Sequence, residues 1–343
     1  IKDIVNNQVS FDAQVYVPQE YYDNLPMERK PQKEDVLYTV VGSFGIPSYV
    51  QTDELFCFER NIALLHPNKA IEPRFLYYSL KNPAFYKGVE IVANGSAQKL
   101  IPLSKLKDLK ISVPDKEAQH RIADILSVYD NLIENNQKQI KLLEEAARRL
   151  YKEWFVDLRF PGHENTKIVD GVPEGWSRGL LKELISVNYG KDHKKAPDDG
   201  NIPVYGSGGL MRKCNKSLFS GEAVLIPRKG SLNNIMYVDE TFWTVDTMFY
   251  ATMKQPHTAV FVYFFVKAFD MYSMNIGAAV PSMTTKILDA MDVVIPDKET
   301  LEKFDKLTKT YFNKIKTLQG QNERLKIARD LLLAKLMSGE VEV

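Results

Sequence analysis

Basic and amide-bearing side chains gather in three short segments of the second half of the chain, at residues 190–195, 212–213 and 228–234. Lys and Arg suit phosphate groups, and Arg and Asn can also form paired hydrogen bonds with the edges of guanine and adenine. The candidate nucleic-acid contacts in this half are Lys191, His193, Lys194, Lys195, Tyr205, Ser207, Arg212, Lys213, Arg228, Lys229, Ser231 and Asn233. Any one of them could instead belong to a solvated surface turn, so only the set as a whole favours contact with DNA.

The first half of the chain offers fewer such side chains. Its glycine-rich turn, Gly42-Ser43-Phe44-Gly45, carries almost no charge. We therefore expect the contacts of this half to come from Lys30, Lys33, Gln98 and Lys99.

One short motif resembles part of an enzyme site. Asn82-Pro83-Ala84-Phe85 is similar to the Asn-Pro-Pro-Tyr/Phe motif of amino-methyltransferases, in which the Asn side chain and a proline carbonyl accept hydrogen bonds from the target amine. It lacks the second proline, and no glycine-rich strand-to-helix turn for a cofactor accompanies it. We interpret it as the end of a helix followed by a proline turn.

Two further patterns also fail to indicate catalysis. The stretch Tyr205–Gly209 is rich in glycine but matches neither nucleotide-binding pattern, and it predicts a tight β-turn. The five histidines, at positions 66, 120, 163, 193 and 257, show no metal-ligand spacing. We therefore expect neither a catalytic residue nor a metal site.

A long amphipathic helix, from about Lys116 to Phe155, organises the chain around these segments. Its apolar residues recur four and three positions apart, a heptad spacing that is typical of a coiled coil. The seam residues are Ile122, Leu126, Tyr129, Ile133, Asn136, Ile140, Leu143, Ala147, Leu150 and Trp154. A helix with such a seam needs a partner for it.

The partner helix follows from an internal repeat. Pro114-Asp115-Lys116-Glu117 recurs 182 positions later as Pro296-Asp297-Lys298-Glu299, and both copies follow an extended apolar run. Residues before proline avoid the helical conformation, so each helix is expected to begin just after the proline, with Asp115 or Asp297 as its cap. The strand block Val36–Ser43 likewise recurs as Val224–Ser231. The chain is therefore a tandem repeat whose frame is duplicated and whose loops diverge.

Length and composition agree with two halves. A chain of 343 residues is long for a single core. Its 45 basic and 44 acidic residues argue neither for nor against nucleic acid. Cys57 and Cys214 stand alone, and no apolar run is long enough to span a membrane, so we expect a soluble, cytoplasmic protein. The sequence begins at Ile1 without methionine, which predicts that the natural N-terminus extends further.

The predicted organisation has five parts. They are a first globular domain at 1–112, a long helix at 113–156, a linker at 157–175, a second globular domain at 176–296, and a second long helix with a tail at 297–343. The fold class is α+β, with two globular α/β domains in inverted orientation joined by two long antiparallel coiled-coil helices, which together form a tandem repeat with pseudo-two-fold symmetry.

Nearly the whole chain resembles the DNA-sequence specificity subunit of type I restriction-modification systems, and this resemblance implies that the domains at 1–112 and 176–296 are its two target-recognition domains. Two matching segments are Gly95–Leu100 and the strand ending at Pro114, with Gln119 opening the helix. The others are Trp154-Phe155-Val156-Asp157, Pro173-Glu174-Gly175-Trp176 and Ile202–Gly209. The chain departs from the pattern at Val280-Pro281-Ser282, which replaces Gln98-Lys99-Leu100 in the second half, and at the opening strand of the first domain.

The resemblance implies a non-catalytic subunit that reads a bipartite double-stranded DNA target and positions two methyltransferase subunits, with restriction subunits in the same assembly. S-adenosylmethionine, ATP and magnesium would then belong to those partners, and this chain would hold no cofactor. Two alternatives stay open. One is a methyltransferase or nuclease with its own active site, and the other is a coiled-coil spacer without a DNA role.

The two helix seams also predict their own register. The second seam reads Phe304, Thr308, Tyr311, Ile315, Leu318, Asn322, Leu325, Arg329, Leu332 and Leu336. Each seam holds one asparagine, and a buried asparagine is costly unless it is paired. An antiparallel pairing that sets Asn136 against Asn322 also places Trp154 against Phe304 and Tyr129 against Arg329, the latter as a cation–π pair.

Overall fold

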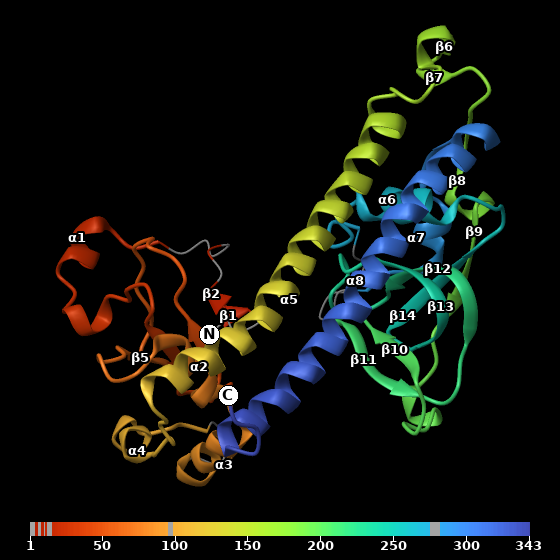
Figure 1. The fold of residues 1–343 in the computed structure, drawn as a ribbon. Coiled ribbons are helices and arrows are strands. Elements are labelled where there is room, and N and C mark those ends of the chain that lie inside the picture. The colour runs from red at the N-terminus through yellow and green to blue at the C-terminus, as the bar shows by residue number, and fades with distance from the viewer. Residues whose placement is uncertain (1–3, 6–7, 10, 12–15, 95–98, 275–281) are drawn as a thin grey trace. The chain divides into compact units, whose positions relative to one another are not determined.

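The computed structural model describes residues 4–5, 8–9, 11, 16–94, 99–274 and 282–343, with only the backbone at Lys195. The chain divides into two compact units (Figure 1): unit 1 comprises Ile1–Lys138 and Leu318–Val343, and unit 2 comprises Gln139–Thr317. Helices α5 (Lys116–Tyr151) and α8 (Lys298–Ser338) each contribute one segment to each unit. The predicted motif at 95–98, its counterpart at 277–279, and Val280-Pro281 lie outside the described residues.

Unit 1 combines short strands and helices with its two segments of the long helices. Its further elements are β1 (Ile4–Val5), β2 (Gln8–Val9), α1 (Gln19–Asp23), β3 (Val36–Thr39), β4 (Pro47–Tyr49), β5 (Ile62–Leu65), α2 (Pro73–Lys81), α3 (Pro83–Val92) and α4 (Leu103–Asp108). Its core joins β3 and α2 to Ile122 and Leu126 of α5 and to Leu333 and Leu336 of α8. The long helices are therefore part of the core of this unit.

Unit 2 is built on a larger sheet. Its elements are β6 (Ile168–Val169), β7 (Val172–Pro173), β8 (Ser177–Leu180), β9 (Ile185–Tyr189), β10 (Ile202–Gly206), β11 (Gly209–Cys214), β12 (Phe219–Pro227), β13 (Met236–Thr244), β14 (Met248–Met253), α6 (Ala259–Lys267), α7 (Thr285–Asp289) and β15 (Asp292–Ile295). Six strands pair in the order β11-β10-β13-β12-β14-β9, and β15 pairs with β8.

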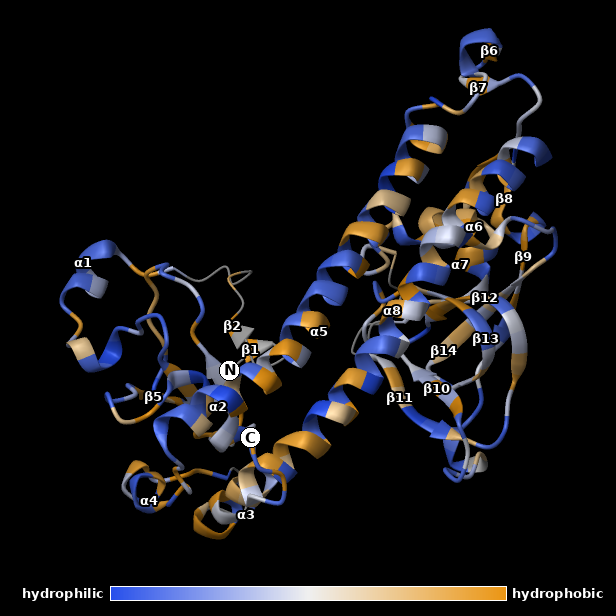
Figure 2. Cartoon of the chain, viewed as in Figure 1, coloured by the Kyte–Doolittle hydropathy of each residue, from blue (hydrophilic) through white to orange (hydrophobic). Residues whose placement is uncertain are grey.

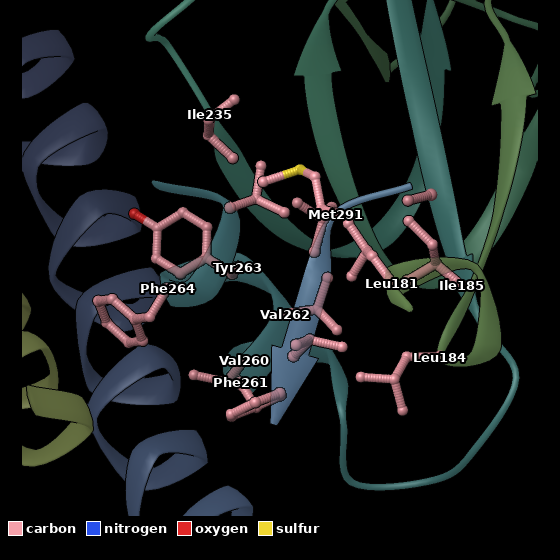
Figure 3. Packing of buried hydrophobic residues seen from close by; sticks show 14 of the residues in the cluster. Leu181, Leu184, Ile185, Ile235, Val260, Phe261, Val262, Tyr263, Phe264 and Met291 are labelled. Carbon is pink, nitrogen blue, oxygen red and sulfur yellow. The ribbon is translucent and has the colours of Figure 1, made fainter. Parts of the chain in front are cut away.

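The strand β12 of this sheet is buried on both faces. Along β12, Val224 and Ile226 pack into the cluster that includes α6, whereas Ala223 and Leu225 pack into a second cluster with β10 and β13. Successive residues of a strand point to opposite faces, so a strand buried on both faces reads as a continuous apolar run. Figure 3 shows the first cluster, in which the rings of Tyr263 and Phe264 point toward α8.

The two units share one three-stranded frame. The central strand β3 pairs antiparallel with β4 and β5, and β12 pairs antiparallel with β13 and β14. Val36 lies opposite Tyr49 in unit 1, and Val224 lies opposite Tyr237 in unit 2, so the two hairpins have the same register. The strand repeat predicted from the sequence is therefore present in the backbone pairing.

The chain returns to each frame at the same place. The Ile101 amide donates to the Val40 carbonyl at 2.9 Å, and the Met283 amide donates to the Arg228 carbonyl at 2.9 Å. Ile101 and Met283 are separated by the 182 positions of the sequence repeat. The duplication thus extends to single backbone hydrogen bonds.

The helix after each frame also repeats, although the sequences of the two halves did not predict this part of the repeat. In α2 the Lys81 ammonium donates to the Tyr77 hydroxyl at 3.2 Å, and in α6 the Lys267 ammonium donates to the Tyr263 hydroxyl at 2.6 Å. The two helices have the same length and carry these pairs at the same positions. Their other residues differ enough that single-sequence matching did not align them.

Both long helices begin where the proline rule predicts. The Ala118 amide donates to the Asp115 carboxylate at 2.8 Å, and the Thr300 amide donates to the Asp297 carboxylate at 2.9 Å. Each aspartate therefore caps its helix. The prediction of a strand ending at Pro114 is wrong, because a strand needs a partner strand and no described segment pairs with residues 110–113. The equivalent run before the second helix does form a strand, β15, which pairs with β8.

The predicted seams agree with the burial. Every seam residue of α5 and α8 is buried or half-buried, and Figure 2 shows apolar and polar residues alternating along both helices. In unit 1 the Asn136 side-chain amide donates to the Asn322 amide oxygen at 2.9 Å, the contact that the antiparallel register predicts. In unit 2 the rings of Trp154 and Phe304 lie 5.8 Å apart, again as predicted.

One predicted seam contact is wrong. Arg329 makes no cation–π contact with Tyr129 in the described part of the chain, and its guanidinium forms an ion pair with Asp130 instead. The Tyr78 hydroxyl also donates to Asp130, at 2.8 Å. A carboxylate offers a cation more electrostatic stabilisation than an aromatic ring, so Asp130 takes the arginine.

Candidate nucleic-acid interface

Four loops meet at one end of the six-stranded sheet of unit 2. They are residues 190–195 after β9, 207–208 between β10 and β11, 228–235 between β12 and β13, and 245–247 between β13 and β14. Backbone hydrogen bonds tie them together: the Lys191 amide donates to Thr244 at 2.9 Å, and the Arg228 amide donates to Thr247 at 2.8 Å. Most candidate residues of the second half, scattered in sequence, thus belong to loops at one edge of one sheet, whereas Tyr205 lies in β10 and Arg212 and Lys213 lie in β11.

Several cationic side chains of these loops and of β11 are accessible to solvent. Lys191, Lys194, Lys213 and Lys229 are exposed, while His193 and Arg228 are half-buried. None of these six side chains forms an ion pair with an acidic residue in the described part of the unit. Ser231 is exposed as well, and the side chain of Lys195 lies outside the described residues.

Two of the candidate side chains hold the loops in place. The Arg212 guanidinium donates to the carbonyls of His193, Ala196 and Lys213, the last at 3.1 Å. The Asn233 amide donates to Asp270 at 2.9 Å and accepts from the Met271 amide at 2.8 Å. Because these polar groups already have partners, their geometry favours a structural role over base reading.

The turn at residues 205–209 is also held by its neighbours. β10 and β11 form a hairpin across residues 207–208, which confirms the tight β-turn predicted there. The Tyr205 hydroxyl donates to Glu240 at 2.5 Å, and the Ser207 carbonyl accepts from the Asn234 amide at 2.9 Å. Gly230 has φ +83°, and a Cβ there would lie 2.7 Å from the Ser207 hydroxyl, so only glycine lets this loop approach the turn.

Arg228 has a different environment from Arg212. Its guanidinium carbon lies 5.5 Å from the centre of the Tyr189 ring, and its Nη1 donates to the Asp246 carbonyl at 3.2 Å. Tyr189 ends β9 and is 55% exposed. Tyr189 is not among the predicted contacts, because an aromatic residue at the end of an alternating strand does not reveal which cation it supports.

In unit 1 the candidate lysines are engaged within the chain. Lys30 donates to the Asp23 carbonyl at 2.9 Å and lies over the Tyr22 ring, and Lys33 forms an exposed ion pair with Asp53 at 3.2 Å. An exposed pair of this kind contributes little to stability and can be exchanged for another anion. Gln98 lies outside the described residues.

Lys99 lies beside the glycine-rich turn of unit 1. Its ammonium is 5.6 Å from the centre of the Phe44 ring, and that ring stacks on Tyr86 at 5.9 Å. Gly45 has φ +84°, and a Cβ there would lie 2.5 Å from the Tyr86 ring, so the turn needs glycine. This turn therefore presents a single cation on an aromatic platform.

The enzyme-like motif has a structural explanation. The Asn82 amide oxygen accepts from the Ala84 amide at 3.1 Å and so caps α3. Pro83 is the first residue of that helix, so the predicted proline turn is instead a helix start. Among the described residues, no group of three or more His, Cys, Asp or Glu side chains could hold a metal ion.

Unit 1 also contains a polar cleft of about 500 Å³ between its globular part and its two long-helix segments, lined in part by Arg74, Tyr78, Asp130 and Arg329. Arg74 is paired with Glu72 at 2.9 Å, and Arg329 is paired with Asp130. Close by, burial lowers the pKa of Lys81 to about 8, although the nearby Asp130 opposes this shift. Arg74 also pairs with Asp124 of α5 at 2.8 Å, and the Lys81 ammonium lies 3.8 Å from the Asp130 carboxylate, so these charges join α2 to α5.

No helix within the described residues is long and apolar enough to cross a membrane.

The family model for the type I restriction modification DNA specificity domain matches the chain twice, over residues 4–145 and 173–326. The MjaIX type I restriction enzyme specificity subunit of Methanocaldococcus jannaschii is 26% identical over 318 residues, which cover 81% of this chain and 71% of that protein. The HindI specificity subunit of Haemophilus influenzae is 23% identical over 421 residues, which cover 93% of this chain and 89% of that protein.

Among solved structures, the S subunit of a type I restriction-modification system from M. genitalium has a similar fold. The TM-score is 0.58 at 23% identity, and the match covers 90% of this chain and 84% of that one. The two matches to the family model cover most of the chain and correspond to its two repeats. The chain therefore belongs to the family of type I restriction-modification DNA specificity subunits.

Proposed function

We propose that this chain reads a bipartite double-stranded DNA target, with one half-site for each unit, and that it performs no catalysis itself. The observation that carries the proposal is the pair of identical three-stranded frames bearing unlike loops. In unit 2 the loops at one end of the sheet present several exposed cations, and such a group of cations suits the DNA backbone. A duplicated frame with unlike loops fits two related but different recognition tasks.

The proposed target consists of two unlike half-sites separated by a spacer that is not read. Half-sites about one turn of DNA apart, roughly 34 Å, present the same face of the duplex to two equivalent readers. In this proposal the long helices set the distance between the readers. Lengthening either helix would then change the spacer and leave each half-site as it was.

The chain would also position two methyltransferase subunits, and restriction subunits would join the same assembly. One feature of unit 1 supports such docking. Ile125, Val128 and Leu132 are exposed apolar residues on α5, away from the seam. Their spacing of three and four positions is the pattern by which a helix packs against a partner helix. In this proposal S-adenosylmethionine, ATP and magnesium act in the partner subunits.

Titration of duplex DNA with the full chain at several salt concentrations tests this function. A linear decrease of log affinity with log salt is expected, because bound lysines release counterions from the phosphates. Failure to bind duplex at any salt concentration would favour a coiled-coil spacer. Binding of S-adenosylmethionine, or magnesium-dependent cleavage of DNA by the chain alone, would favour an enzyme.

A further inference from the structure

Arg228 occupies a fixed position of the duplicated frame. Its amide donates to Thr247 at 2.8 Å, and its carbonyl accepts from Met283 at 2.9 Å. The equivalent residue of unit 1 is Val40, whose amide donates to Asn61 at 2.9 Å. The frame therefore holds the backbone of this position in both units, while only unit 2 places a guanidinium there.

The guanidinium of Arg228 is held on two sides. The ring of Tyr189 lies against it, with 5.5 Å between the ring centre and the guanidinium carbon, and the Asp246 carbonyl accepts from Nη1 at 3.2 Å. The Tyr189 ring in turn packs edge-on against the buried Phe249, with 5.1 Å between ring centres. A cation supported in this way loses less conformational freedom when it binds a ligand.

Within the described residues, the remaining edge of the guanidinium has no hydrogen-bond or ion-pair partner. Neither Nε nor Nη2 of Arg228 forms a hydrogen bond within the described residues, and no carboxylate there pairs with it. Arg212, on strand β11, has its guanidinium occupied by backbone carbonyls. Arg228 therefore presents a fixed, planar pair of donors, whereas the neighbouring lysines Lys191 and Lys229 are flexible point charges.

We propose that Arg228, positioned by Tyr189, reads one guanine in the half-site bound by unit 2. This inference rests on the proposed function and names the base and the pair of residues that reads it. A guanine presents two acceptors, N7 and O6, at the spacing of the two donors on one edge of a guanidinium. The phosphates nearby suit the exposed lysines, whose reach is longer and whose geometry is less strict.

The experiment uses the full chain co-purified with its methyltransferase subunits and a randomised duplex library. Selection with the wild-type complex gives the preferred sequence, and competition with duplexes changed at one position at a time gives the discrimination at each position. Arg228→Lys should lower the discrimination for one guanine by about tenfold, because lysine lacks the planar pair of donors. The other half-site should keep its preference.

Tyr189 is tested as a positioning residue. Tyr189→Leu should reduce the discrimination at that same guanine by about twofold to fivefold, and Tyr189→Phe, which keeps the ring, should restore it. Lys194→Ala is the matched control, which should weaken binding to all sequences alike. Thermal unfolding of each variant shows whether it is folded.

The outcomes separate this inference from the proposed function. An unchanged preference in Arg228→Lys, or a uniform loss of affinity like that of Lys194→Ala, would overturn the inference and assign Arg228 to phosphate or to structure. If the wild-type complex enriches no sequence at all, the proposed function itself fails. Equal losses in Tyr189→Phe and Tyr189→Leu would overturn the role of the ring.

Discussion

Units 1 and 2 place the same frame under different loops. Val36 opposite Tyr49 and Val224 opposite Tyr237 show that the hairpin register is the same in both. Unit 2 then adds β9, β10 and β11 around this frame, and its loops present several exposed cations at one sheet end. In unit 1 the corresponding turn carries Phe44 stacked on Tyr86 with Lys99 above it.

This difference separates the residues that hold the fold from those available for recognition. The shared positions are buried strand residues and the Tyr–Lys pairs of α2 and α6. The positions that differ lie in the loops, where a change of side chain does not disturb the core. Two readers of different sequences can arise in this way from one duplicated frame.

The largest expected effect comes from shortening a buried side chain of a long helix, which can be compared between the two units. Phe304 is fully buried in unit 2 among aromatic rings, and Ile122 is the equivalent buried residue of unit 1. Phe304→Ala should cost about 3–5 kcal/mol of unfolding free energy, and Ile122→Ala about 2–5 kcal/mol. Hydrogen exchange should show that each substitution lowers the protection of backbone amides in its own unit first.

Leu307→Ala is the matched control for Phe304→Ala, because Leu307 is exposed on the same helix. It should change the unfolding free energy by less than about 0.5 kcal/mol. If Phe304→Ala loosened unit 1 as much as unit 2, the division into two units would not describe their stability.

The second effect concerns the asparagine pair of unit 1. Asn136→Leu leaves the buried Asn322 amide without its partner and should cost about 1–3 kcal/mol. The double variant Asn136→Leu/Asn322→Leu should recover most of this loss, because it removes both polar groups. Denaturant unfolding of the four proteins of this double-mutant cycle measures the coupling, and additive losses would contradict the pairing.

The third effect is a pH dependence specific to unit 1. Burial lowers the pKa of Lys81 to about 8, so between pH 8 and 10 the folded chain binds fewer protons there than the unfolded chain. Stability from this group therefore increases as the pH rises through that window. From pH 8 to pH 10, the unfolding free energy of the wild type should rise by roughly 1–2 kcal/mol relative to that of Lys81→Met.

Below pH 7.5 the stability difference between wild type and Lys81→Met should be constant, which provides the internal control. Unfolding curves measured in both pH ranges check the prediction. A difference that stays flat up to pH 10 would show that the ammonium of Lys81 is not desolvated in the folded chain.

The smallest effect tests the loops of unit 2. Lys194→Ala should lower the slope of log affinity against log salt by about one unit, because one phosphate contact is lost. Lys182→Ala is the matched control, since Lys182 is exposed just before β9, at the opposite end of that strand. Equal slopes of log affinity against log salt for the two variants would contradict the proposed contact between these loops and DNA.

The helix pair was the most predictable part of the fold. The heptad seams and the capping aspartates follow from local spacing. The Asn136–Asn322 contact follows from pairing the single buried asparagine of each seam with that of the other. The start of α3 was missed, because Asn82-Pro83 can end one helix and begin the next, and local chemistry does not distinguish the two. The pairing of Arg329 depended on Asp130, which lies beside the seam and outside the pattern.

The loops were less predictable, because their side chains are fixed by contacts distant in sequence. The sequence marks Arg212 and Arg228 as equal candidates, and only the structure shows that backbone carbonyls occupy Arg212. The role of Tyr189 comes from its contact with Arg228, which follows it in the sequence by almost forty residues. The type of a residue indicates what it can bind, but tertiary contacts decide whether it is available.

Methylome sequencing of a host that carries the intact system tests the central claim, that each unit reads its own half-site. We predict methylation at two unlike half-sites separated by an unread spacer, and Arg228→Lys should change only one of them. A continuous recognition sequence, or a change of both half-sites in that single variant, would contradict the claim.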